Sequence, residues 1–147
     1  MQEVFSMWRH TRMVVLVALS AAIYAAVLIP FKGFVLIPGI TELRPAGALP
    51  VVLGLFFGPA GAWGAAIGNL IGDFFGTLGI WSFIGFIGNF FFAYVPYKIW
   101  NRLGLIDNND PEPLRVNTMK KMTNFAVVGI LGSISCALII GWGLEVL

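Results

Sequence analysis

Charged residues are scarce in this chain. Lysine, arginine, aspartate and glutamate together make up 11% of its 147 residues, whereas an ordinary soluble domain contains about 25%. Hydrophobic residues reach 59%, and the mean hydropathy is +0.89. This combination is typical of an integral membrane protein. The net charge of +2 is too small to indicate a nucleic-acid partner.

Cysteine and histidine are nearly absent. Cys136 stands alone in an apolar run, and His10 lies beside Arg9 and Arg12 in a basic flank suited to lipid headgroups. One residue of each kind gives neither a disulfide framework nor a metal site, and no nucleophile–base set is visible. The chain also has no glycine–lysine loop for phosphate. The sequence thus predicts no enzyme, no cofactor and no metal, and ATP-driven transport would require partner ATPases.

Apolar runs, in contrast, fill most of the chain. They predict five transmembrane helices, at residues 13–29, 46–57, 58–78, 80–100 and 123–147. The second run is short, and it becomes a plausible span only if Leu43 and Arg44 begin it at the interface. Residues 31–45 are expected to be a loop, and residues 101–121 are strongly polar. The expected fold is an all-α helical bundle in a lipid bilayer, with one domain over residues 1–147.

The third predicted helix carries glycine at every fourth position. In a soluble helix each interior glycine costs about 1 kcal/mol relative to alanine. In a bilayer such a row is useful, because small residues let two helices approach closely. We therefore predict that this row is a packing surface, formed by Gly64, Gly68, Gly72 and Gly76.

A polar pair lies one position further round the same helix. Asn69 and Asp73 share a stripe because they are four residues apart. An acid in an apolar segment costs about 2.5–3.5 kcal/mol on insertion scales, so it is expected to face protein or water. The pair is our first candidate for contacting a polar ligand. The alternative is a structural hydrogen bond to a neighbouring helix.

Basic residues indicate the orientation of the chain. Loops rich in lysine and arginine stay on the cytoplasmic side, and these residues flank the first helix and the polar segment: Arg9, Arg12, Lys98, Arg102, Arg115, Lys120 and Lys121. The amino end is therefore expected in the cytoplasm and residues 31–45 outside. Asp73 then lies about 7–8 Å from the outer end of its helix at 1.5 Å per residue.

Further candidates for substrate binding lie at the outer side or at mid-depth: Glu42, Arg44, Trp81, Asn89 and Glu145. Glu42 and Arg44 either clamp a ligand or pair at the interface. Trp81 either stacks on a heterocycle or belongs to the aromatic belt. Asn89 either reads a ligand edge or satisfies a backbone group. Glu145 and nearby Trp142 lie towards the end of the last predicted helix.

With these features the chain resembles the substrate-binding membrane subunit, or S component, of an energy-coupling factor (ECF) transporter. The resemblance rests on small size, the alanine-rich first helix LSAAIYAAVL, the long outer first loop and the glycine-rich third helix. It implies an importer of a vitamin or related micronutrient in the plasma membrane of a prokaryote, working with a transmembrane T subunit and two ATP-binding subunits. It also implies that an alanine-x-x-x-alanine pattern on the first helix docks the T subunit. Two pairs satisfy the pattern, Ala21 with Ala25 and Ala22 with Ala26.

One stretch is more distinctive. The run ELRPAGALPVVLGLFFGPAGAWGAAIGNLIGD is similar in layout to the arginine–glutamate stretch and glycine–asparagine helix of queuosine-precursor S components. The order of the charges differs, so flavin, thiamine, cobalamin-like and deazapurine ligands all stay open. The family fold has six helices and five are predicted here, so either a last helix is missing or the short second helix is miscounted.

Two other functions fit the same residues. A stand-alone carrier or channel would use Asp73 as a proton- or ion-coupling acid, and it would transport without ATPases. A membrane scaffold subunit would bind no ligand.

Overall fold

The computed structural model describes residues 2–31, 35–37, 41–42, 45–76, 78–104 and 109–146. Six α-helices make up most of these parts: α1 (Gln2–Ser6), α2 (Thr11–Phe31), α3 (Leu49–Phe57), α4 (Pro59–Phe74), α5 (Ile80–Ile99) and α6 (Met119–Val146). Short 3-10 helices, Met7–Arg9 and Pro45–Ala48, precede α2 and α3. The prediction of a helical fold is confirmed. The predicted loop at residues 31–45 contains a small antiparallel pair of strands, β1 (Val35–Ile37) and β2 (Thr41–Glu42).

The five predicted helices are present as α2 to α6, but they differ in length. Within the described parts, α2, α5 and α6 are long and apolar enough to cross a membrane. At 1.5 Å per residue α3 rises about 14 Å and α4 about 24 Å, less than the hydrocarbon core of about 30 Å. The turn between them is held by Gly58, whose φ of 58° suits glycine. The lengths of α3 and α4 therefore do not support the prediction of five full spans.

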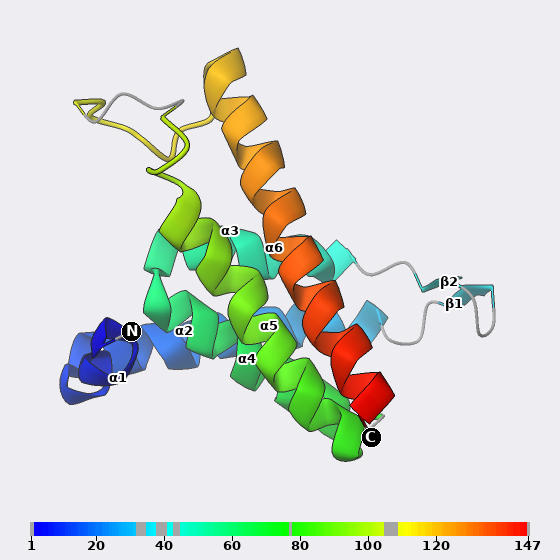
Figure 1. Cartoon of the computed structure of the whole chain (residues 1–147). Coiled ribbons are helices and arrows are strands. Elements are labelled where there is room, and N and C mark those ends of the chain that lie inside the picture. Colours follow the sequence, from blue (N-terminus) through cyan, green and yellow to red (C-terminus); the bar gives the residue numbers. More distant parts are fainter. Residues whose placement is uncertain are drawn as a thin grey trace.

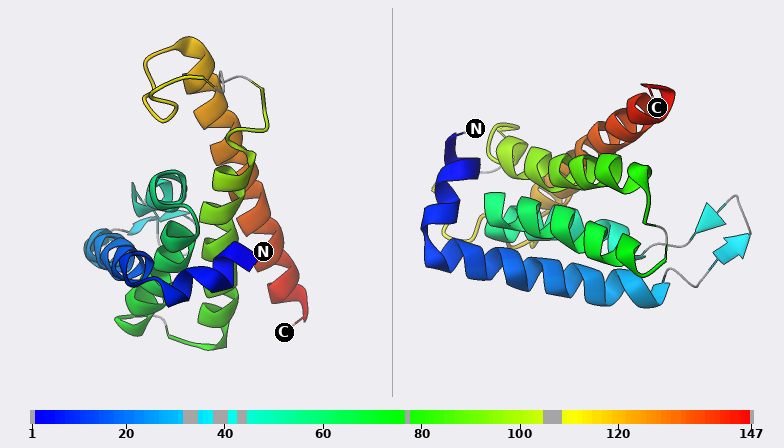
Figure 2. Two further views of the ribbon diagram at one scale, coloured as in Figure 1. Left: turned by 90° about the vertical axis from the view of Figure 1, so that its left-hand side faces the viewer. Right: turned by 90° about the horizontal axis from the view of Figure 1, so that it is seen from below.

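Helix α4 lies between α2 and α5, and α6 packs on α5 (Figures 1 and 2). The glycine row explains the contact with α2. A Cβ on Gly64 would collide with that of Ser20, and one on Gly68 would lie 2.9 Å from the Ala21 carbonyl oxygen. Gly72 likewise faces Leu28. The packing role is thus confirmed for three glycines, whereas Gly76 follows the end of α4 and a Cβ there would meet nothing within 4 Å.

Helix α1 folds across one end of the bundle, turned away from the direction of α2 (Figure 2). Its Glu3 carboxylate pairs with the Lys98 ammonium of α5. The Trp63 indole N–H of α4 donates to the Val4 carbonyl oxygen at 3.1 Å. These contacts place the amino-terminal segment, with its basic residues Arg9 and Arg12, at the end of the bundle where α5 finishes. We call this the basic end. The β1–β2 pair projects from the opposite end (Figure 2).

The polar segment after α5 is fastened to the start of α6. The Lys121 ammonium contacts Asp110 Oδ2 at 2.6 Å and donates to the Glu112 carbonyl oxygen at 2.8 Å. The Asn124 amide donates to the Trp100 carbonyl oxygen at 3.1 Å. The hydrogen bond that the Lys121 ammonium donates to Asp110 Oδ2 holds the pKa of Asp110 below its usual range.

The shift of the Asp110 pKa predicts a pH-dependent stability. Because the folded-state pKa is lowered, the pair stabilises the fold above the ordinary aspartate pKa of about 3.9, and the contribution is lost as the pH falls through the lowered value. We expect Asp110→Asn to lower the unfolding temperature slightly at neutral pH, by an amount that vanishes in acid. Thermal unfolding followed by circular dichroism measures this. An equal decrease at every pH would contradict it, and Glu112→Gln, in an exposed pair with Arg115, is the control expected to change nothing.

Candidate functional site

A pocket of about 320 Å³ lies between α4, α5 and α6. It sits near the end of the bundle where α4 and α6 finish and α5 begins, opposite the basic end. Its polar side chains come from α4 and α5, and α6 supplies apolar ones. The lining residues are Asn69, Asp73, Trp81, Ser82, Ile84, Gly85, Asn89, Ile140 and Leu144. The structure therefore brings together four of the seven predicted substrate-binding residues.

The α4 side of the pocket is the pair Asn69 and Asp73. The Asn69 amide donates to Asp73 Oδ2 at 3.2 Å, as expected for residues four apart on one stripe. Asn69 is buried and Asp73 half-buried. A Cβ on Gly85 of α5 would lie 3.1 Å from Asn69 Nδ2 and 4.0 Å from Asp73 Oδ2. Gly85 thus lets α5 approach the polar pair closely.

The α5 side is organised around Asn89. Its amide donates to the Gly85 carbonyl oxygen at 2.9 Å, and its Oδ1 accepts from the Tyr24 hydroxyl of α2 at 3.1 Å. These bonds orient the buried amide beside the pocket. The Ser82 hydroxyl accepts from the Gly79 N–H at 3.3 Å at the start of α5. Trp81 is 49% exposed, so its indole is accessible where α5 begins.

The sequence interpretation missed several contributors. Trp81, Gly85 and Asn89 follow one another at intervals of four residues. The four-residue spacing that places Asn69 and Asp73 on one helix face therefore also indicates Gly85. Ile140 and Leu144 have the same spacing on α6. No comparable pattern marks Ser82, or Tyr24 behind the pocket.

The other three predicted residues are Glu42, Arg44 and Glu145, and among them only Glu145 has a described side chain. Glu145 is exposed, whereas its neighbour Leu144 lines the pocket, because successive residues of a helix point about 100° apart. Nearby Trp142 is 71% exposed. Arg44 lies outside the described residues, as does the side chain of Glu42, whose backbone belongs to β2.

The two alanine pairs occupy different surfaces of α2. Ala21 and Ala25 are buried, with Ala21 directly against Gly68 of α4. Ala22 and Ala26 are exposed. The first pair therefore packs within the bundle, and the second presents a stripe of small side chains to the outside.

The pocket has the chemistry of a recognition site. A carboxylate accepts hydrogen bonds, carboxamides both donate and accept, and an indole face can stack on a ring. Across the described part of the chain, histidine, cysteine and acidic side chains form no group that could hold a metal ion. The arrangement suits reversible binding of a small polar ring compound.

Comparison with known proteins identifies the family. The profile of the QueT transporter family matches residues 14–147, a range that includes every residue of the pocket. No curated protein and no solved structure matches the chain. The match indicates a membrane transport component and not an enzyme. The chain therefore belongs to the QueT transporter family, ECF S components for queuosine precursors, and the resemblance seen in its sequence is confirmed.

Proposed function

We propose that this chain binds a queuosine precursor, or a closely related deazapurine, in the pocket between α4, α5 and α6. The observation that carries the proposal is the convergence of Asn69, Asp73, Trp81 and Asn89 on one cavity. Its volume of about 320 Å³ lies at the lower end of the range for small-molecule pockets. A flat heterocycle would stack on Trp81 and direct its N–H groups to Asp73. The amides of Asn69 and Asn89 would bind its polar edge.

The pocket would open to the outside of a prokaryotic plasma membrane. Arg9 and Arg12 lie at the end of the bundle where Glu3 of α1 meets Lys98, and basic residues favour the cytoplasmic side. The amino end would then be cytoplasmic and the multi-pass bundle would present Asp73 near its outer surface. The small side chains of α4 would let neighbouring helices approach closely, so that the bundle could form although α3 and α4 are short.

Uptake would require partners. The chain has no loop for binding ATP phosphates, so a T subunit and two ATP-binding subunits would supply the energy. Ala22 and Ala26 form the exposed small-residue stripe on α2, which would allow the close helix contact that such docking needs.

Ligand binding tests the proposed function directly. Purified full-length protein titrated with a queuosine precursor in a calorimeter should bind one molecule per chain, and flavin or thiamine should not bind. Preferential binding of flavin, thiamine or a cobalamin would overturn the substrate assignment. Absence of any bound compound, in titration and in native mass spectrometry, would favour a scaffold subunit.

Docking is tested with a second variant. Replacing Ala22 and Ala26 together by leucine should reduce copurification of the ATP-binding subunits at least about tenfold, because bulky side chains prevent close helix approach. Pull-down of tagged protein coexpressed with candidate T and ATP-binding subunits measures this. Ala137→Leu, at an exposed position on α6, is the matched control. Undiminished copurification by the double variant would exclude this stripe as the docking surface.

A further inference from the structure

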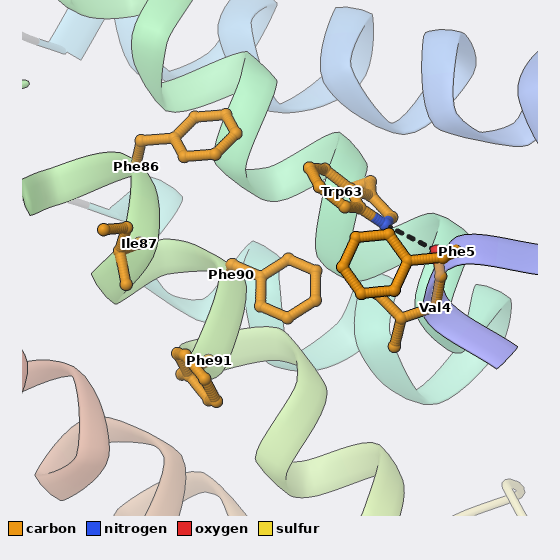
Figure 3. A pocket seen from close by; sticks show the side chains of 7 residues that line it. All are labelled: Val4, Phe5, Trp63, Phe86, Ile87, Phe90 and Phe91. Atoms are coloured by element: carbon orange, nitrogen blue, oxygen red, sulfur yellow. Dashed lines mark hydrogen bonds between the residues drawn. The ribbon is translucent and has the colours of Figure 1, made fainter. Parts of the chain in front are cut away.

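A second hollow lies between α1, α4 and α5, apart from the polar pocket (Figure 3). It has a volume of about 270 Å³ and its lining side chains are all apolar. Aromatic rings dominate the lining, contributed by Phe5, Trp63, Phe86, Phe90 and Phe91. It shares no lining residue with the polar pocket. A polar micronutrient would find no hydrogen-bond partner among these side chains.

The rings are held in a defined arrangement. Trp63 stands at the centre, with its indole N–H donated to the Val4 carbonyl oxygen at 3.1 Å (dashed line in Figure 3). Its ring centroid lies 5.1 Å from that of Phe90 and 6.4 Å from that of Phe5, both edge to face. Since the polar atom of the indole is already bonded, Trp63 offers the hollow only apolar surface. Phe5 is 68% exposed, so the hollow opens at the surface as a groove.

Basic residues follow α1 in the chain, next to a ring that packs on Trp63. The centroid of the Trp8 ring lies 5.5 Å from that of Trp63. Exposed Arg9 follows Trp8 directly, and exposed Arg12 lies at the start of α2. Glu3, the acid of α1, is paired with Lys98. No ion pair of Arg9 or Arg12 occurs among the residues that the structure describes. An aromatic groove near exposed arginines matches an acyl chain joined to a negative headgroup.

We propose that this groove binds one acyl chain of an anionic glycerophospholipid, with the lipid phosphate against Arg9 and Arg12. The chain would fill the groove between Phe5 and Phe90, where apolar surface is otherwise left open to the bilayer. The arginines would select a negative headgroup over a zwitterionic one, because a zwitterionic headgroup carries a compensating positive charge. Bound lipid would also brace α1 against α4 and α5. The inference does not depend on which nutrient occupies the polar pocket.

Native mass spectrometry of the full chain tests the proposal. The protein is released from nanodiscs containing equal amounts of phosphatidylglycerol and phosphatidylcholine with identical acyl chains. One phosphatidylglycerol per chain should be retained, at least about tenfold more often than phosphatidylcholine. Glycerol phosphate, which carries the headgroup charge without the chains, should not displace it. Equal retention of the two lipids, or displacement by glycerol phosphate, would overturn the proposal.

Two variants distinguish the contribution of the groove to lipid retention from that of the arginine charges. Ile87→Trp would fill the groove at a position that is 37% exposed, and it should reduce retention of both lipids. The double variant Arg9→Gln with Arg12→Gln should remove only the preference for phosphatidylglycerol. Ile134→Trp, at a 49% exposed site on α6, is the control and should behave as wild type. Unchanged phosphatidylglycerol retention in both test variants would exclude this site, and unchanged nutrient binding in them would show that they fold.

Discussion

Asp73→Ala is expected to weaken nutrient binding by about tenfold to a hundredfold. A hydrogen bond to a charged group contributes about 1.5–3 kcal/mol, and each 1.4 kcal/mol is a tenfold change in affinity. The substitution also removes the acceptor of the Asn69 amide hydrogen bond, so the second polar group of the pocket loses its orientation. Calorimetric titration of the purified variant with a queuosine precursor measures the effect.

Companion variants make the result specific. Asp73→Asn retains a hydrogen-bond acceptor without the charge, and we expect a smaller loss than with alanine. Glu145→Gln changes an exposed carboxylate outside the pocket and should leave affinity unchanged. An unaltered affinity of folded Asp73→Ala would show that the pocket is not the binding site. Transport without ATPases in reconstituted vesicles, abolished by Asp73→Asn, would instead indicate a stand-alone coupled carrier.

Gly64→Ala should destabilise the fold severely, although alanine is the better helix former. In place of a hydrogen, the new methyl group would collide with Ser20 Cβ and lie 3.1 Å from both the Ala21 nitrogen and the Val17 carbonyl oxygen. Two of these three atoms belong to the backbone of α2, so the whole helix must shift. Overpacking of this kind costs about 1–3 kcal/mol or more. We expect a large fall in folded yield and in the unfolding temperature.

The chain offers a matched control for this effect. Gly141 lies in α6, is exposed, and a Cβ there would meet nothing within 4 Å. Gly141→Ala should therefore be neutral or stabilising, since alanine is favoured over glycine in a helix by about 1 kcal/mol. Fluorescence-detected size exclusion and thermal unfolding in detergent compare the two variants. Equal stability of both would contradict close packing of α2 on α4.

The amino-acid sequence by itself determined the class of protein, the positions of the helices and the faces that each helix presents. Apolar content places the chain in a membrane, and the spacing of four residues unites Asn69 with Asp73 and aligns the glycines. Such features are local, because side chains three or four residues apart always share a helix face. An exception is α4, which ends at Phe74 and not at the predicted Leu78, so that Gly76 lies outside the helix.

The tertiary structure decided which faces meet. It set Gly85 of α5 against Asn69, turned Leu144 rather than Glu145 towards the pocket, and buried one alanine pair of α2 while exposing the other. Spacing along one helix contains no information on its rotation against a neighbour. That rotation depends on how side chains from distant parts of the chain pack together, and close packing allows only some pairings. The pocket exists because those pairings bring the polar faces of α4 and α5 together.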